Sequence, residues 1–83
     1  MEFRRVTITL ETGLQDRYAA GFVQLASQFT SEIQIQYKQM KLNAKSFMGV
    51  LCMDLRPGTC IVLGAEGKDA AAALNALEAF LNP

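Results

Sequence analysis

Apolar and polar side chains alternate near the start of the chain, where Val6, Ile8 and Leu10 are separated by threonines. A period of two is typical of a strand with one face toward solvent, so we expect a strand over Phe3–Leu10. The same alternation returns over Glu32–Tyr37 and predicts a second strand.

Two further segments also predict strands, one of them short and the other mostly apolar. Met40–Asn43 predicts a short strand with Met40 and Leu42 facing inward, joined to the second strand by a hairpin turn at Lys38–Gln39. Cys60–Glu66 is more apolar than the other segments, which favours a central strand of the sheet.

Apolar side chains recur at helical spacing in the segment from Asp16 to Gln28, which predicts a helix there. The buried stripe of this helix is expected to be Ala19, Phe22, Val23 and Ala26. The opposite stripe has small or polar side chains and is free to meet a partner. Its members are Arg17, Ala20, Gly21 and Gln24.

Two more helices follow from the same reasoning. A short helix is expected over Ser46–Met53. It would end before the Pro57–Gly58 pair, which is typical of a tight turn. A closing helix is expected to begin with Asp69 as its N-cap and to run through an alanine-rich start. Its apolar stripe is Ala70, Leu74, Leu77 and Leu81.

The resulting order is strand, helix, strand, strand, helix, strand, helix. This order predicts an α+β fold in which a four-stranded antiparallel sheet carries three helices on one face, an open-faced sandwich of βαββαβα topology. The chain has 83 residues, of which 51% are hydrophobic, enough for one modest core and no second one. We therefore expect a single domain over residues 1–83.

Composition narrows the classes of function. Eight basic and eight acidic residues cancel, so the chain lacks the basic surface of a protein that binds nucleic acid or membranes. It contains no histidine, which removes the commonest general acid or base and every Ser-His or Cys-His nucleophile pair. The six glycines are scattered and form no phosphate-binding loop. We expect neither catalysis nor a cofactor.

The two cysteines, Cys52 and Cys60, do not form a disulfide framework, and without histidine they do not complete a zinc site. We expect both to be reduced, half-buried small hydrophobes, with a reactive thiol as the alternative. No apolar run approaches the roughly 20 residues of a membrane span. These features favour a cytoplasmic protein without a metal site.

Ser46 places a hydroxyl directly before a run of large apolar side chains, which favours a helix N-cap. The same position also suits a regulatory phosphoserine. A phosphate there would add about −1.5 to −2 charges at the positive end of a helix dipole, with Lys45 beside it. These residues alone leave both interpretations open.

Three segments, in order along the chain, carry a resemblance to a known family: Gly13–Ala20, Asn43–Leu51 and Gly58–Asp69. They resemble, respectively, the phosphocarrier motif, the regulatory serine region and the segment that follows in the HPr family of small phosphocarrier proteins from the bacterial sugar phosphotransferase system. The resemblance covers essentially the whole chain and implies an HPr-like fold.

One departure from the family pattern changes the implied function. The family carries its phosphoryl group on a histidine at the position of Gln15, and a carboxamide nitrogen is not nucleophilic because its lone pair is delocalised. Tyr18 also stands where the family usually has proline. Gln15 together with Ser46 is typical of the family's catabolite-repression branch, although drift of a paralogue would also explain Gln15.

The resemblance therefore implies a regulatory phosphoprotein that is not an enzyme. Ser46 would be phosphorylated by HPr kinase/phosphorylase, and the phosphoprotein would bind a CcpA-type transcription regulator as its corepressor. The implied docking surface spans two helices, with Val50 and Met53 facing inward. Its members are Arg17, Ala20, Gln24, Phe47, Met48 and Leu51.

Two other functions stay open. The chain would be a constitutive interaction module if the same apolar patch docked on a metabolic enzyme without phosphorylation. It would be a phosphotransferase component if Cys52 or Cys60 accepted the phosphoryl group.

Overall fold

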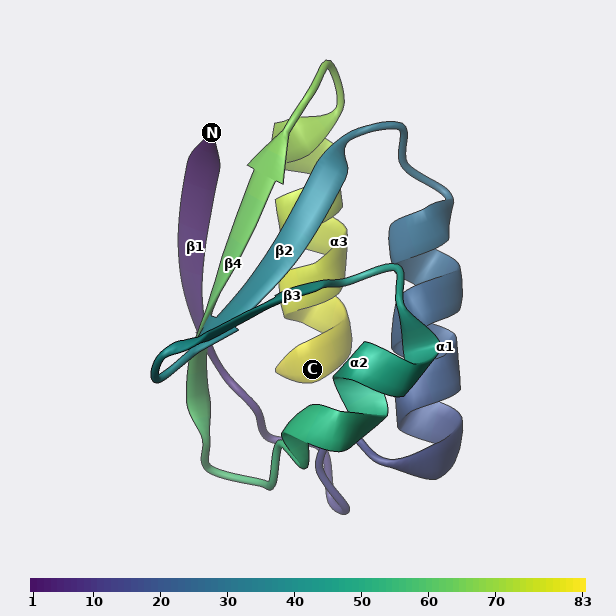
Figure 1. The fold of residues 1–83 in the computed structure, drawn as a ribbon, viewed down its shortest axis with the longest axis vertical. Coiled ribbons are helices and arrows are strands. Elements are labelled where there is room, and N and C mark those ends of the chain that lie inside the picture. The colour runs from purple at the N-terminus through teal and green to yellow at the C-terminus, as the bar shows by residue number, and fades with distance from the viewer.

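Four strands form one antiparallel sheet in the computed structural model, which describes residues 1–83 (Figure 1). They are β1 (Glu2–Thr7), β2 (Glu32–Tyr37), β3 (Met40–Asn43) and β4 (Cys60–Glu66). The strand order is β1-β4-β2-β3, so the apolar β4 pairs with both β1 and β2 and is central, as predicted.

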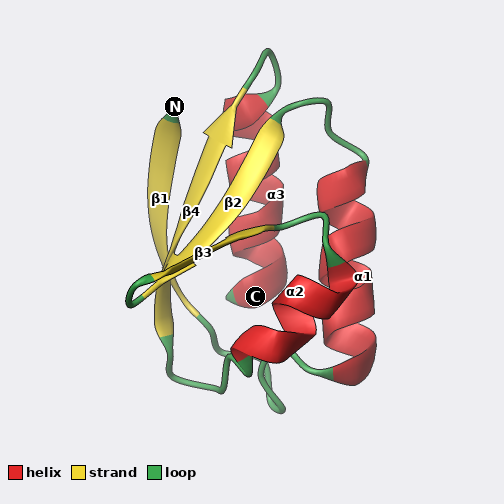
Figure 2. Cartoon of the chain, viewed as in Figure 1, coloured by secondary structure: helices red, strands yellow, loops and turns green.

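Three helices cover one face of the sheet and leave the other face open (Figures 1 and 2). They are α1 (Asp16–Ser27), α2 (Phe47–Met53) and α3 (Ala70–Leu81). The predicted element order is confirmed. None of the three helices combines the length and the apolar character that crossing a bilayer requires.

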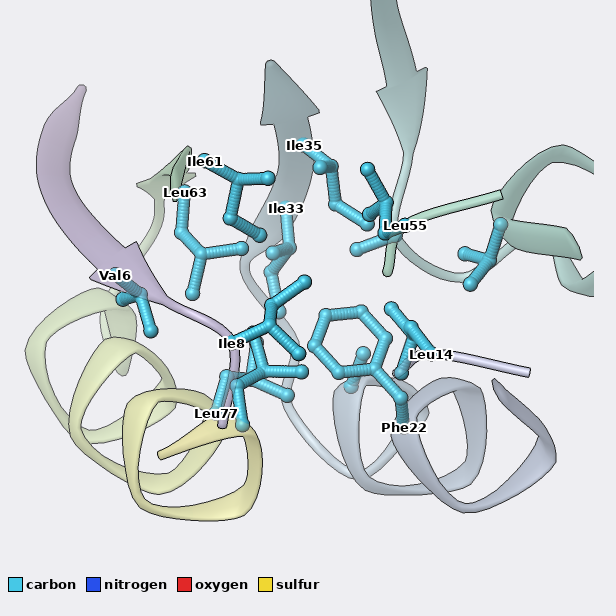
Figure 3. Packing of buried hydrophobic residues seen from close by; sticks show 14 of the residues in the cluster. Val6, Ile8, Leu14, Phe22, Ile33, Ile35, Leu55, Ile61, Leu63 and Leu77 are labelled. Atoms are coloured by element: carbon cyan, nitrogen blue, oxygen red, sulfur yellow. The ribbon is translucent and has the colours of Figure 1, made fainter. Parts of the chain in front are cut away.

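The core lies between the sheet and the helices. The strand register places Leu63 opposite Ile35, and Ile35 opposite Leu42, so that one row of apolar side chains faces the helices. Phe22 projects from α1 into the middle of this layer (Figure 3). Its ring also meets Phe80 of α3 edge to face, with the ring centroids 6.2 Å apart. The core therefore connects the sheet with α1 and α3.

The first strand is shorter than predicted, because β1 ends at Thr7 and not at Leu10. The amide of Thr9 donates to the carbonyl oxygen of Leu81 at 2.9 Å, so the chain leaves the sheet to meet the end of α3. Ile8 and Leu10 nevertheless remain buried.

Three predicted environments are wrong. Met40 is exposed at the turn end of β3, where no helix covers the sheet. Cys52 and Cys60 are free and exposed, not half-buried. Gly21 does not lie on a free surface, because a Cβ there would come within 3.1 Å of the Phe80 ring.

Asp69 occupies the predicted N-cap position of α3, but its side chain makes no cap hydrogen bond. The carboxylate instead accepts bonds from the backbone and hydroxyl groups of Thr30 and Ser31. It therefore joins the loop before α3 to the loop before β2.

Candidate functional site

Ser46 is the N-cap of α2, as predicted, with extended backbone and an exposed side chain. Its Oγ accepts a hydrogen bond from the amide of Gly49 at 3.2 Å. This bond satisfies one of the free amides at the start of the helix. The hydroxyl therefore both caps α2 and stays open to solvent.

The side chains of α2 divide into buried and exposed groups. Val50 and Met53 are buried, as predicted, whereas the side chains of Phe47 and Met48 are 41% and 65% exposed. Leu51, which was predicted to face outward, is half-buried: part of it packs against the core and part stays exposed. The reason is that α2 contacts both α1 and β3, so its free face is narrow. The exposed apolar patch beside Ser46 consists of Phe47 and Met48.

Lys45 precedes the cap, but its ammonium group is already engaged. Nζ donates to the carbonyl oxygen of Phe29 at 2.7 Å, just beyond the end of α1. A positive charge at the C-terminal end of a helix is favourable to the helix dipole. Lys45 therefore ties the start of α2 to the end of α1.

Gln15 stands directly before α1 but does not cap that helix with its side chain. Its Nε2 donates instead to Oδ1 of Asp54 at 2.7 Å. The other carboxylate oxygen of Asp54 pairs with the guanidinium of Arg56 at 3.2 Å. Sequence reasoning missed Asp54 and Arg56. The bond between Gln15 and Asp54 joins residues 39 positions apart, and no local sequence pattern indicates it.

A surface pocket of about 410 Å³ lies beside Gln15. The guanidinium carbon of Arg17 lies 5.2 Å from the centre of the Tyr18 ring in this region. The aromatic ring at the position where the family usually has proline therefore holds Arg17 in a cation–π contact. The pocket is lined by Glu11, Thr12, Gln15, Asp16, Arg17 and Tyr18.

The predicted docking residues of α1 lie on its surface, where Arg17, Ala20 and Gln24 are all exposed. Since α1 and α2 contact each other, these side chains and the Phe47/Met48 patch belong to adjoining elements (Figure 1). No three His, Cys, Asp or Glu side chains lie together as a metal site would require.

Comparison with known proteins gives consistent matches along the chain. Residues 3–83 match the family model described as the phosphotransferase-system HPr component phosphorylation site. The HPr-like protein Crh of Halalkalibacterium halodurans is 47% identical over 78 residues, which cover 94% of this chain and 93% of that protein.

Two solved structures are also similar. The phosphocarrier protein HPr of Bacillus anthracis has a TM-score of 0.96 and 41% identity, covering 98% of this chain and 96% of that chain. The catabolite-repression protein Crh of Bacillus subtilis, described as a swapped, intertwined dimer, has a TM-score of 0.77 and 42% identity, covering 98% of this chain and 93% of that chain. These matches confirm the predicted fold.

Proposed function

The chain belongs to the HPr family of the sugar phosphotransferase system. We propose that it is a regulatory phosphoprotein of carbon catabolite repression, switched by phosphorylation of Ser46. It is neither an enzyme nor a phosphohistidine carrier. The observation that carries the proposal is an exposed Ser46 beside an exposed apolar patch, in a chain whose carrier position is Gln15.

The environment of Gln15 supports the loss of carrier function. A carboxamide cannot accept a phosphoryl group as imidazole does, because its nitrogen lone pair is delocalised into the carbonyl. The same nitrogen already donates to Asp54 at 2.7 Å. Phosphoryl transfer from Enzyme I therefore finds no acceptor at this position.

The environment of Ser46 supports a phosphorylation switch. A phosphate would add about −1.5 to −2 charges at the positive end of α2, where the helix dipole favours an anion. Basic groups of a partner would recognise it with charge-assisted hydrogen bonds. The proposed enzyme is HPr kinase/phosphorylase, and the proposed partner of the phosphoprotein is a CcpA-type transcription regulator.

The apolar patch supplies the rest of the proposed interface. Burying Phe47 or Met48 against a partner contributes up to about 1.5 to 3 kcal/mol each before ordering costs. Arg17, Ala20 and Gln24 extend the surface onto the adjoining α1, while Leu51 adds only its exposed part. Contact with DNA is made by the regulator, and the whole switch operates in the cytoplasm.

Intact-mass measurement tests the switch. One sample contains HPr kinase/phosphorylase and ATP, and a second contains Enzyme I and phosphoenolpyruvate. We expect one phosphoryl adduct in the first sample only, mapped to Ser46 and absent from Ser46→Ala. An unmodified protein in the first sample would contradict the proposal, and an adduct on Cys52 or Cys60 in the second would favour a phosphotransferase role.

Binding to the purified regulator tests the docking surface, with Phe47→Ala compared with Phe3→Ala. Both phenylalanines are exposed, but Phe3 lies in β1, at the opposite edge of the sheet from β3, the strand that α2 contacts. We expect Phe47→Ala to weaken binding of the phosphoprotein about tenfold or more, and Phe3→Ala to leave it unchanged. Equal binding with and without phosphate would instead favour a constitutive interaction module.

A further inference from the structure

The bond between Gln15 and Asp54 joins the loop before α1 to the C-terminal end of α2. Asp54 is the C-cap of α2, and its own amide donates to the carbonyl oxygen of Leu51 at 3.2 Å. Its carboxylate receives the Gln15 amide at 2.7 Å. One residue thus ends the helix with its backbone and holds Gln15 with its side chain.

The backbone of Asp54 adopts an unfavourable conformation. Its φ of 51° and ψ of 54° lie in the left-handed region, where residues with a Cβ are uncommon and glycine is the usual choice at a helix end. Asparagine and aspartate tolerate this region better than other residues do. The bond from Gln15 is made while Asp54 holds this geometry, and it therefore stabilises it.

The neighbouring backbone holds Gln15 opposite Asp54. The amide of Leu14 donates to the carbonyl oxygen of Leu55 at 2.8 Å, which pairs the two loops one residue away from the side-chain bond. Gly13 has a φ of 72°, and any Cβ there would overlap the Leu55 carbonyl oxygen. The two loops are therefore in close contact, and the carboxamide needs little further ordering to reach Asp54.

The helix that ends at Asp54 is short enough to depend on its ends. α2 has seven residues, whereas isolated helices below about 12 to 15 residues are marginal in water. Ser46 stabilises its first turn through the Gly49 amide. The last turn has no basic side chain to complement the helix dipole.

We infer that Gln15 is a positioning residue, whose carboxamide holds the Asp54 carboxylate and so orders the C-terminal turn of α2. The residue at the family's carrier position thereby acts on the helix that presents Ser46, Phe47 and Met48. The consequence for docking rests on the proposed function, whereas the effect on α2 does not.

Amide hydrogen exchange measured residue by residue by NMR tests this inference. Gln15→Glu keeps the side-chain shape but replaces the donor with a carboxylate that repels Asp54. We expect exchange of the Asp54 amide and its neighbours in the last turn of α2 to accelerate about threefold to tenfold relative to amides of α3.

The decisive readout is rescue. Adding Asp54→Asn to Gln15→Glu reverses the direction of the bond, because the new amide donates to the new carboxylate. We expect exchange to return to within about twofold of the wild type. Unchanged exchange in Gln15→Glu, or acceleration that the second substitution leaves in place, would overturn the inference.

Two controls separate this bond from other effects. Gln39→Glu makes the same chemical change in the exposed hairpin turn and should leave α2 exchange unchanged. Arg56→Gln removes the other partner of Asp54, an exposed ion pair at 3.2 Å, and should have a smaller effect than Gln15→Glu. Acceleration in Gln39→Glu equal to that in Gln15→Glu would also overturn the inference.

Phosphorylation of the wild type and hydrogen exchange of the Gln15 variants test the proposed function and the positioning role separately. If kinase and ATP leave wild-type Ser46 unmodified while rescue is observed, the proposed switch fails and the positioning role stands. If Ser46 is phosphorylated but Gln15→Glu leaves α2 exchange unchanged, the switch stands and the positioning role fails.

Discussion

Asp69 shows how one side chain joins two loops distant in sequence. Its carboxylate accepts bonds from the Ser31 hydroxyl and from the amides of Thr30 and Ser31, at 2.9 and 3.0 Å for the amides. Chiefly because of the Ser31 hydroxyl, and then the Thr30 amide, the pKa of Asp69 falls from 3.8 to about 2, although burial opposes the shift. The ionised form is therefore the one that the fold stabilises.

This shift predicts a loss of stability in acid. Since the folded pKa of about 2 lies below the ordinary 3.8, the contribution of Asp69 is complete above about pH 4 and disappears as the pH falls toward 2. In Asp69→Asn we expect a lower midpoint of thermal unfolding at pH 7 and a flatter pH dependence between 4 and 2. Identical slopes for the variant and the wild type in that range would contradict this assignment.

At the scale of the element, α2 is the segment whose order depends most on its caps. Ser46 closes its N-terminal turn, and Asp54, held by Gln15, closes its C-terminal turn. The helix also carries the exposed patch, so its buried side must come from few residues, chiefly Val50 and Met53. A short helix with a narrow buried side needs both ends satisfied.

Ser46→Ala is expected to lower the free energy of unfolding by about 1 kcal/mol, because the Gly49 amide loses its acceptor. Urea denaturation measures this difference. Ser46→Asp is the matched control, since aspartate caps helices as well as serine does, and it should stay within about 0.5 kcal/mol of the wild type. A loss in Ser46→Asp as large as in Ser46→Ala would show that the side-chain oxygen does not act as the cap.

At the scale of the whole molecule, the sheet has two unlike faces. One face packs under the helices around Phe22 (Figure 3). On the other face, Phe3 is 57% exposed. Phe22 also contacts Phe80, so it joins α1, α3 and the sheet in one core. The free energy of folding is concentrated in that layer.

Phe22→Ala is expected to destabilise the protein by about 3 to 5 kcal/mol, a large part of the total stability of a small domain. Phe3→Ala, the same substitution on the open face, should cost no more than about 0.5 kcal/mol. Urea denaturation of the two variants makes the comparison. Similar losses at the two positions would contradict the burial that distinguishes the two faces.

Sequence patterns predicted the element order, the central place of β4 and the cap at Ser46. Hydrophobic period and cap chemistry depend on residues within a few positions of one another, so they can be evaluated without the fold. The absence of histidine likewise limits the chemistry whatever the fold, and the resemblance to the HPr family gives Gln15 its meaning.

The surfaces that remain free and the side chains that meet depend on how the helices pack on the sheet. Leu51 is half-buried because α2 contacts both α1 and β3. Gly21 is covered because the Phe80 ring of α3 lies against it. Gln15 meets Asp54 across 39 positions of sequence. Such contacts depend on how separate elements pack in space, and local periodicity carries no information about that packing.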